Sequence, residues 1–268
     1  MIKVTVVQPK YYCGDNPDKK IAEFIIEQMN SASKNSILVL PEYCNAGGLT
    51  NKDEELKALG RAQEMKNIAS EIAKERNCYL AINVLESRED RIFNSTYLYG
   101  KDGKKKFVYD KIHLPPAEIN LGVQYGNGDC TCEVDGIKFA FMTCYDVYYN
   151  EQIEYIAKFK PDIIIVPGYQ RGERVDIIRA QAKLVAFRCN AYLLRASYSM
   201  DSNEKGGCSM IVAPNGEILK DLGSNVGSAS VEIEEKYKYT RTAGFGMGVV
   251  NNDQFIDMGM RPEIFDKR

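Results

Sequence analysis

Three side chains that could act together in nucleophilic catalysis each follow an apolar stretch of this sequence. Cys144 comes directly after KFAFMT, Glu42 after ILVLP, and Lys111 after FVYD. Taken singly, residues of these types at such positions are ordinary core or surface residues. Taken together they supply a thiol, an acid and an ammonium group, which are the groups that covalent acyl transfer through a cysteine uses.

The chemistry predicted for this set is attack of a thiolate on a carbonyl carbon. A free cysteine is only a few per cent thiolate near neutral pH, so Cys144 needs a base. Glu42 can be that base if a partly dry pocket raises its pKa, and His113, the only histidine, is the other candidate. Lys111 and the backbone N–H of Tyr145 can then stabilise the oxyanion. The scheme uses no metal and no organic cofactor.

The elements that must position these groups follow an alternating pattern, which is typical of an α/β layered fold. The predicted strands are 2–7, 37–40, 79–84, 96–99, 106–109, 138–143, 163–166, 192–196, 210–212 and 229–233. The predicted helices are 21–29, 54–76, 153–159 and 175–187.

Three short segments recur in the same order in the two halves of the chain. IKVTVVQ is similar to IKFAFMT, SILVLPEY to DIIIVPGY, and RNCYLAI to RCNAYLL. The series predicts two similar halves that form a four-layer α-β-β-α sandwich of two sheets with an internal pseudo-twofold repeat. No linker-like stretch divides the chain, so residues 1–268 are predicted to form one domain. Ligands in such folds lie at the carboxyl ends of strands, where the thiol, acid and ammonium are expected.

Composition excludes several classes of protein. The formal net charge is -2, which steers the chain toward neither nucleic acid nor an anionic membrane surface. No apolar stretch is long enough to span a bilayer, and the N-terminus resembles a strand more than a signal peptide, so a cytoplasmic location is expected. The eight cysteines lack the paired short spacing of structural zinc, so no metal site is predicted.

With these motifs in view, the chain resembles the nitrilase superfamily of carbon–nitrogen hydrolases. The resemblance rests on LVLPEY around Glu42, YDKIHL around Lys111 and TCYD around Cys144, with support from GGCSMIVAPNGEIL and RPEIF. It implies the same α-β-β-α sandwich, and assembly as a homodimer or a higher even-numbered oligomer.

The resemblance also implies a second active-site glutamate, for which Glu118 is the match; an exposed loop acid is the alternative interpretation. One departure concerns the segment after the cysteine. The family often has Arg-Phe-Pro-Glu there, whereas this chain has YYNE, which leaves the shape of the pocket near Cys144 and Tyr145 open.

Two arginines follow the segment DIIIVPGY. The resemblance to carbamoyl-amino-acid hydrolases implies that Arg171 or Arg174 binds a substrate carboxylate, a task that suits the planar guanidinium. The alternative is a pair of surface arginines matched with neighbouring acids.

The predicted function is hydrolysis of a non-peptide C–N bond in a small linear amide or N-carbamoyl compound through a thioester on Cys144. Tyr145 is expected to contact the substrate. One alternative is a nitrilase that converts a nitrile to an acid, against which the Tyr-Asp pair after Cys144 argues. Another is a catalytically silent binding protein on the same fold. A nucleotide-binding protein is discounted because no glycine-rich phosphate loop follows any strand.

Overall fold

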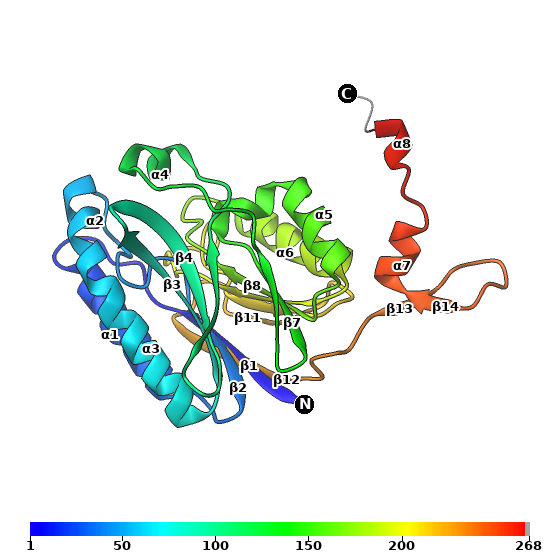
Figure 1. Ribbon diagram of the computed structural model, residues 1–268, viewed down its shortest axis with the longest axis horizontal. Helices are drawn as coiled ribbons and strands as arrows, with labels where there is room; N and C mark the ends of the chain where they lie inside the picture. The colour runs from blue at the N-terminus through cyan, green and yellow to red at the C-terminus, as the bar shows by residue number, and fades with distance from the viewer. Residues whose placement is uncertain (266–268) are drawn as a thin grey trace.

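A computed structural model of the chain describes residues 1–265, which form two six-stranded mixed sheets packed face to face (Figure 1). The first sheet has the order β12 (Gly227–Ile233), β1 (Ile2–Gln8), β2 (Ser36–Val39), β3 (Tyr79–Arg88), β4 (Arg91–Tyr99) and β5 (Lys105–Asp110). The second has the order β11 (Ile218–Asp221), β10 (Met210–Val212), β9 (Tyr192–Ala196), β8 (Ile163–Pro167), β7 (Ile137–Phe141) and β6 (Thr131–Val134).

Helices cover the outer face of each sheet, which completes the predicted α-β-β-α sandwich. Helices α1 (Pro17–Asn30) and α3 (Ala62–Arg76) lie on the first sheet, and α5 (Asn150–Phe159) and α6 (Val175–Cys189) lie on the second (Figure 1). Each helix buries an apolar stripe against its sheet, which is the pattern of helices that cover a sheet; α1 and α3 expose mainly charged residues, whereas α6 also exposes Ile177 and Leu184.

The predicted pseudo-twofold repeat is present in the strand topology. In the first half β1, β2 and β3 are parallel, and β4 and β5 follow antiparallel; β7, β8, β9, β10 and β11 repeat this pattern in the second half. The covering helix ends at a left-handed asparagine in both halves, Asn77 after α3 and Asn190 after α6. Asparagine tolerates this conformation better than most residues, which explains its use at both caps.

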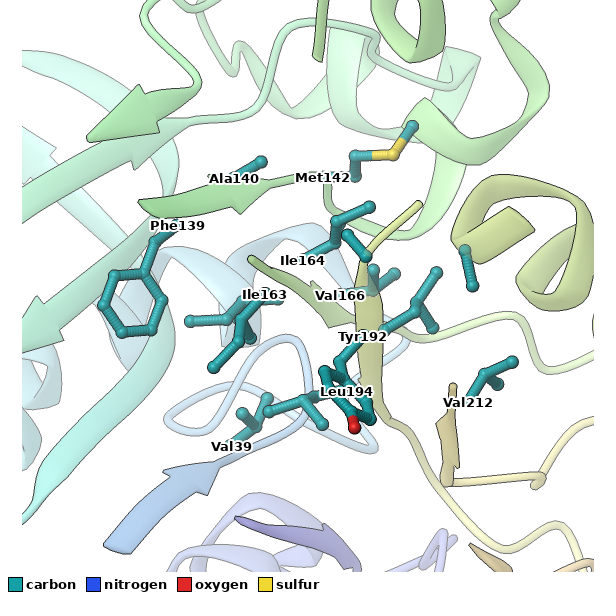
Figure 2. Close-up of a cluster of buried hydrophobic side chains, with 14 of the residues drawn as sticks. Val39, Phe139, Ala140, Met142, Ile163, Ile164, Val166, Tyr192, Leu194 and Val212 are labelled. Atoms are coloured by element: carbon teal, nitrogen blue, oxygen red, sulfur yellow. The ribbon is translucent and has the colours of Figure 1, made fainter. Parts of the chain in front are cut away.

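The core lies between the sheets, where side chains of β1 and β2 meet those of β8 and β9. Figure 2 shows Val39 of β2 beside Ile163 and Leu194 of the second sheet. Burial of each such side chain contributes about 1.5–3 kcal/mol, so this interface fixes how the strand ends of the two halves face each other.

The helix predicted over 54–76 is wrong in one respect, because it is interrupted. The structure has α2 (Lys52–Ala58), a 3₁₀ turn η1 (Leu59–Arg61) and then α3. Gly60 has low helix propensity, and Arg61 is held by an ion pair with Asp18 and by the carbonyl of Asn45 at 3.0 Å. The two helices can therefore bury different faces.

Several short elements were not predicted from the sequence. They are β6, β11, α4 (Pro116–Leu121), η2 (Cys144–Tyr148), β13 (Thr240–Thr242), β14 (Val249–Asn251), α7 (Asn252–Asp257) and α8 (Pro262–Phe265). Elements of three to six residues hold too few periodic positions to stand out in a sequence.

The last four of these elements form an arm that extends from the sandwich (Figure 1, orange to red). Asn190 anchors it: Nδ2 donates to Tyr239 O at 3.1 Å and to Asp253 Oδ1 at 2.9 Å, and Oδ1 accepts from Tyr239 N–H at 2.8 Å. The arm exposes the apolar side chains of Phe245, Met247, Val249, Met258 and Ile264. In residues 1–265, no helix has the length and apolar character needed to cross a membrane.

The two asparagine caps give a matched test of this anchor. Asn190→Gly keeps the left-handed conformation but removes three hydrogen bonds to the arm, so we expect the arm to be weakened by about 1–3 kcal/mol. Limited proteolysis should cut the variant faster beyond residue 233, whereas Asn77→Gly, the equivalent change in the other half, should leave that cleavage rate unchanged. Equal rates in the two variants would contradict the assignment.

Candidate active site

The carboxyl ends of the strands from both halves surround a cavity of about 420 Å³. Glu42 follows β2, Lys111 follows β5 and Cys144 follows β7, and all three line this cavity together with Glu118 of α4. The structure therefore brings together the four residues for which the sequence predicted catalysis. Glu118 is 5% exposed, so the alternative of an exposed loop acid is wrong.

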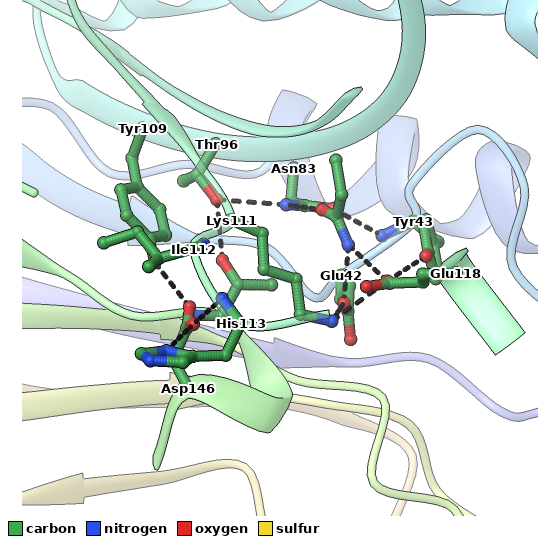
Figure 3. A network of polar contacts seen from close by, with 12 residues as sticks. Glu42, Tyr43, Asn83, Thr96, Tyr109, Lys111, Ile112, His113, Glu118 and Asp146 are labelled. Carbon is green, nitrogen blue, oxygen red and sulfur yellow. Dashed lines mark hydrogen bonds and ion pairs between the residues drawn. The ribbon is translucent and has the colours of Figure 1, made fainter. Parts of the chain in front are cut away.

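The Lys111 ammonium lies between two carboxylates. Nζ is 2.8 Å from Oε1 of Glu42 and 2.9 Å from Oε1 of Glu118 (Figure 3). Glu42 and Lys111 are each only 1% exposed, so the charges are almost completely removed from water. Buried charges are stable only when they are paired and hydrogen-bonded, and removing one partner of such a pair typically costs about 3–5 kcal/mol.

The burial of these groups shifts their acidities. Burial raises the pKa of Glu42; the Lys111 ammonium opposes this effect and the Glu118 carboxylate reinforces it. Although burial alone would lower the pKa of Lys111, Glu42 and Glu118 raise it above its usual range. Lys111 is therefore a permanent cation, and Glu42 can take up a proton more readily than an exposed glutamate.

The surroundings of Cys144 favour the neutral thiol over the thiolate. Burial and then the Glu42 carboxylate raise the pKa of Cys144, while Lys111 acts in the opposite direction. A thiol in this state cannot act as a nucleophile unless a neighbouring base removes its proton during the attack. Among the carboxylates, Glu42 has the largest effect on the pKa of the Cys144 thiol.

The Cys144 backbone has an uncommon conformation that the surrounding structure maintains. Its φ of 50° lies in the left-handed region, which is costly for a residue other than glycine or asparagine. Asp146, completely buried, holds the turn: Oδ2 accepts from Thr143 N–H at 2.7 Å and from the Tyr109 hydroxyl at 2.5 Å. Oδ1 accepts from the backbone N–H of His113 at 2.9 Å.

His113 supports this turn from outside the cavity. Its Nδ1 lies 3.0 Å from Asp146 Oδ1 and 3.1 Å from Gln152 Oε1, and its ring stacks on Tyr149 at 3.8 Å. The hydrogen bond to Asp146 raises the pKa of His113 despite partial burial. The histidine is not among the residues that line the cavity, which leaves Glu42 as the candidate base.

Two tyrosines of the site were missed in the sequence. The Tyr43 hydroxyl donates to Oε1 of Glu118, and the ring meets Tyr169 edge to face at 5.6 Å. Both residues end the repeated segments LPEY and VPGY, so the internal repeat was a signal for them. Asn94, which donates to Oε1 of Glu42, gave no signal beyond being a polar residue in a strand.

The two predicted carboxylate-binding arginines lie in different environments. Arg171 lines the cavity; its guanidinium donates to the Tyr11 hydroxyl at 2.8 Å and lies over the Tyr169 ring at 4.7 Å. Arg174 is not among the lining residues and forms a bidentate pair with Asp176 at 3.0 and 2.7 Å. Only Arg171 is placed to meet a ligand in the cavity. Tyr145, the third predicted substrate contact, also lines it.

Within residues 1–265, no group of three or more His, Cys, Asp or Glu side chains is arranged to hold a metal ion. The eight cysteines are all free thiols, and most of them are buried in the core.

Comparison with known proteins identifies the family. The model of the carbon–nitrogen hydrolase family matches residues 3–240. The 2-oxoglutaramate amidase of Bacillus subtilis is 26% identical over 220 residues, 80% of this chain and 83% of that protein. An omega-amidase of Saccharomyces cerevisiae is 23% identical over 245 residues, 83% of each chain.

Solved structures share the fold. An amidase from Nesterenkonia has a TM-score of 0.77 at 17% identity, with 99% of this chain and 95% of that chain covered. A variant of that amidase in complex with butyramide has a TM-score of 0.76 at 17% identity, with coverages of 99% and 96%. The chain belongs to the carbon–nitrogen hydrolase family, which confirms the predicted family and fold.

The raised pKa of Glu42 predicts how the free energy of unfolding depends on pH. Its pKa in the folded state lies above the value of 4.5 that it has when exposed, so the folded state binds the proton more tightly. Stability from this group is therefore present below about pH 4.5 and is lost as the pH rises through the folded-state pKa. Because Lys111 keeps Glu118 as its partner when Glu42 is replaced, Glu42→Gln should have a higher free energy of unfolding than the wild type at pH 8, and the difference should narrow toward pH 4.

Urea unfolding measured across this pH range tests the prediction. Glu64→Gln is the control for replacing a carboxylate outside the site, because Glu64 is exposed on α3. A glutamine variant at position 42 that is less stable than the wild type at pH 8 would refute the argument.

Proposed function

We propose that this protein hydrolyses a small linear amide to a carboxylic acid and ammonia through a thioester on Cys144. The observation that carries the proposal is the Lys111 ammonium held between Glu42 and Glu118 in the cavity that Cys144 also lines. This arrangement supplies a base, an oxyanion partner and a nucleophile in one site, in which the acid and the ammonium are buried. The amidase relatives support amide hydrolysis as the reaction class.

The first half of the reaction forms the thioester. Glu42 accepts the proton of the Cys144 thiol as Sγ attacks the amide carbonyl carbon. The oxyanion that forms accepts hydrogen bonds from Lys111 Nζ and from the Tyr145 backbone N–H. When the tetrahedral intermediate collapses, the C–N bond breaks, and the leaving nitrogen takes the proton from Glu42 and departs as ammonia.

The second half of the reaction releases the acid. Glu42, again ionised, takes a proton from a water molecule that attacks the thioester carbonyl carbon. The same two donors stabilise the second oxyanion. Collapse breaks the C–S bond, and the Cys144 thiolate recovers its proton from Glu42. The enzyme returns to its starting state, and no external electron donor or acceptor takes part.

The substrate that we propose carries a carboxylate as well as the amide. Arg171 is a cation on the cavity wall whose partners among residues 1–265 are a hydroxyl and two aromatic rings rather than a carboxylate. It is thus available to bind an acidic substrate group in bidentate geometry. One relative is named for 2-oxoglutaramate, a half-amide of a dicarboxylic acid. That compound carries both an amide and a carboxylate, as the proposed substrate does.

Two alternative functions can be distinguished from this proposal by experiment. A nitrilase would convert a nitrile of matched length, whereas the amidase should leave it unchanged. A catalytically silent binding protein would hold the amide without releasing ammonia, and its Cys144 would react with an electrophile no faster than the other seven thiols.

We also propose assembly as a homodimer or a higher even-numbered oligomer. The arm presents apolar side chains to solvent at Phe245, Met247 and Val249, which fits a surface that a second copy covers.

The covalent step gives a direct test of the reaction. With a short amide, ammonia release should be measurable, and rapid acid quenching should trap an acyl adduct on the peptide that contains Cys144. Cys144→Ala should lower kcat by at least about a thousandfold and abolish the adduct. Cys130→Ala, a change at a thiol that does not line the cavity, should retain both. An adduct on another residue, or full activity in Cys144→Ala, would rule out the mechanism.

The arginine gives a test of the substrate class. Succinamate and butyramide have the same chain length, but only succinamate carries a carboxylate. Arg171→Met should raise KM for succinamate by at least about tenfold, because a charge-assisted hydrogen bond is lost, and should change KM for butyramide little. Arg174→Met is the matched control and should leave both substrates unaffected. An equal rise in KM for both substrates in Arg171→Met would contradict the proposed contact between Arg171 and the substrate carboxylate.

A further inference from the structure

Asn94 of β4, which is 1% exposed, contacts Glu42, Glu118 and Lys111. Its Nδ2 donates to Oε1 of Glu42 and to Oε1 of Glu118, each at 2.8 Å. Its backbone carbonyl accepts from the N–H of Lys111 at 2.9 Å. One residue therefore bridges the two carboxylates with its side chain and holds the lysine with its main chain.

Asn83, on the neighbouring strand, fixes the orientation of the Asn94 side-chain amide. Asn83 of β3 donates from Nδ2 to Asn94 Oδ1 at 2.7 Å and to Thr96 Oγ1 at 3.0 Å. Because the Asn94 oxygen is occupied by this donor, only its NH2 group can face the carboxylates. Asn83 Oδ1 in turn accepts from Tyr43 N–H at 2.8 Å, directly after Glu42 (Figure 3). The amide and the loop that presents Glu42 are thus held by the same residue.

This bridge divides the oxygens of each carboxylate into two classes. Oε1 of Glu42 and Oε1 of Glu118 each accept from Lys111 and Asn94. The opposite oxygens, Glu42 Oε2 and Glu118 Oε2, are buried and have no hydrogen-bond partner among the described residues. Leaving a buried acceptor unpaired is costly, so the fold maintains these oxygens in a state that a proton or a ligand can satisfy.

We propose that Asn94 is a positioning residue that locks one oxygen of each carboxylate, so that the free oxygen of Glu42 faces the thiol proton of Cys144. The inference rests on the proposed function, in which Glu42 is the base. Without the bridge, Glu42 could turn either oxygen toward Lys111, and proton transfer would occur from a mixture of geometries.

The direction of a pH effect follows from the surroundings of Glu42. The titratable groups that face it are Lys111 of the β5 end, Glu118 of α4, Cys144 of η2, the neighbouring Tyr43, and Tyr198, which follows β9. The Asn94 hydrogen bond lowers the pKa of Glu42, so its loss raises that pKa. Since the base must be ionised to accept the thiol proton, the acid limb of kcat/KM moves to higher pH.

The experiment compares Asn94→Ala and Asn94→Ser with the wild type. We expect kcat/KM for a short amide at pH 7.5 to fall by about ten- to a hundredfold, with the acid limb displaced to higher pH. The rate at which iodoacetamide alkylates Cys144 should show the same displacement, and this readout requires no turnover. Asn252→Ala is the control: Asn252, in α7 of the arm, is also buried but donates to the Phe187 carbonyl of α6. Its pH profile should match that of the wild type.

The outcomes separate the two proposals. A wild-type protein that releases no ammonia from any amide would contradict the proposed function, while the alkylation profiles would still report on Asn94. Variants that lose activity but keep the wild-type acid limb in both readouts would overturn the positioning role. If neither Asn94 variant folds, Asn83→Ala is used instead, because it removes the hydrogen bond that orients the Asn94 amide. This variant should displace the pH profile of Cys144 alkylation in the same direction. An unchanged profile in Asn83→Ala would overturn the proposal.

Discussion

The burial of one ammonium between two carboxylates is the constraint on which the rest of the site depends. Glu42 and Glu118 cannot both stay ionised out of water unless a cation and hydrogen-bond donors satisfy them. Lys111 supplies the charge, and Asn94 supplies neutral donors to the same two oxygens. Burial raises the pKa of Glu42, and the one negative charge that the set retains in excess acts in the same direction. The basicity needed to activate a thiol thus arises from a buried and incompletely neutralised pocket.

This pocket forms where the two similar halves of the fold meet. The LPEY loop after β2 and the VPGY loop after β8 hold equivalent places in the repeat, and their tyrosines, Tyr43 and Tyr169, meet in the cavity. Tyr198 of the second half donates its hydroxyl to the carbonyl of Glu42 at 2.6 Å. Catalytic geometry therefore belongs to the junction of the halves, since neither half holds the base, the cation and the thiol on its own.

Much of this arrangement was predictable because its signals are local. Strand ends at Glu42, Lys111 and Cys144 could be recognised from apolar runs, and the repeat predicted the sandwich. Asn94 was not predictable, because its role depends on the register that places Asn83 opposite Thr96 and hence beside it. Arg171 and Arg174 could not be told apart by spacing; the ion pair with Asp176 and the stacking on Tyr169 separate them. The interruption at Gly60 was hidden because helical periodicity continues across it.

The pairing of β1 with β12 joins residues 2–8 to residues 227–233, with Thr5 bonded to Ser230 at 2.9 Å. On the ribosome, where domains are made from the N-terminus at about 5–20 residues per second, β1 can pair with β2 early, but its other edge stays uncovered until residues 227–233 have been made. An uncovered strand edge invites pairing with another nascent chain. The order of the strands thus makes synthesis of β12, rather than pairing of β1 with β2, the event that completes the first sheet.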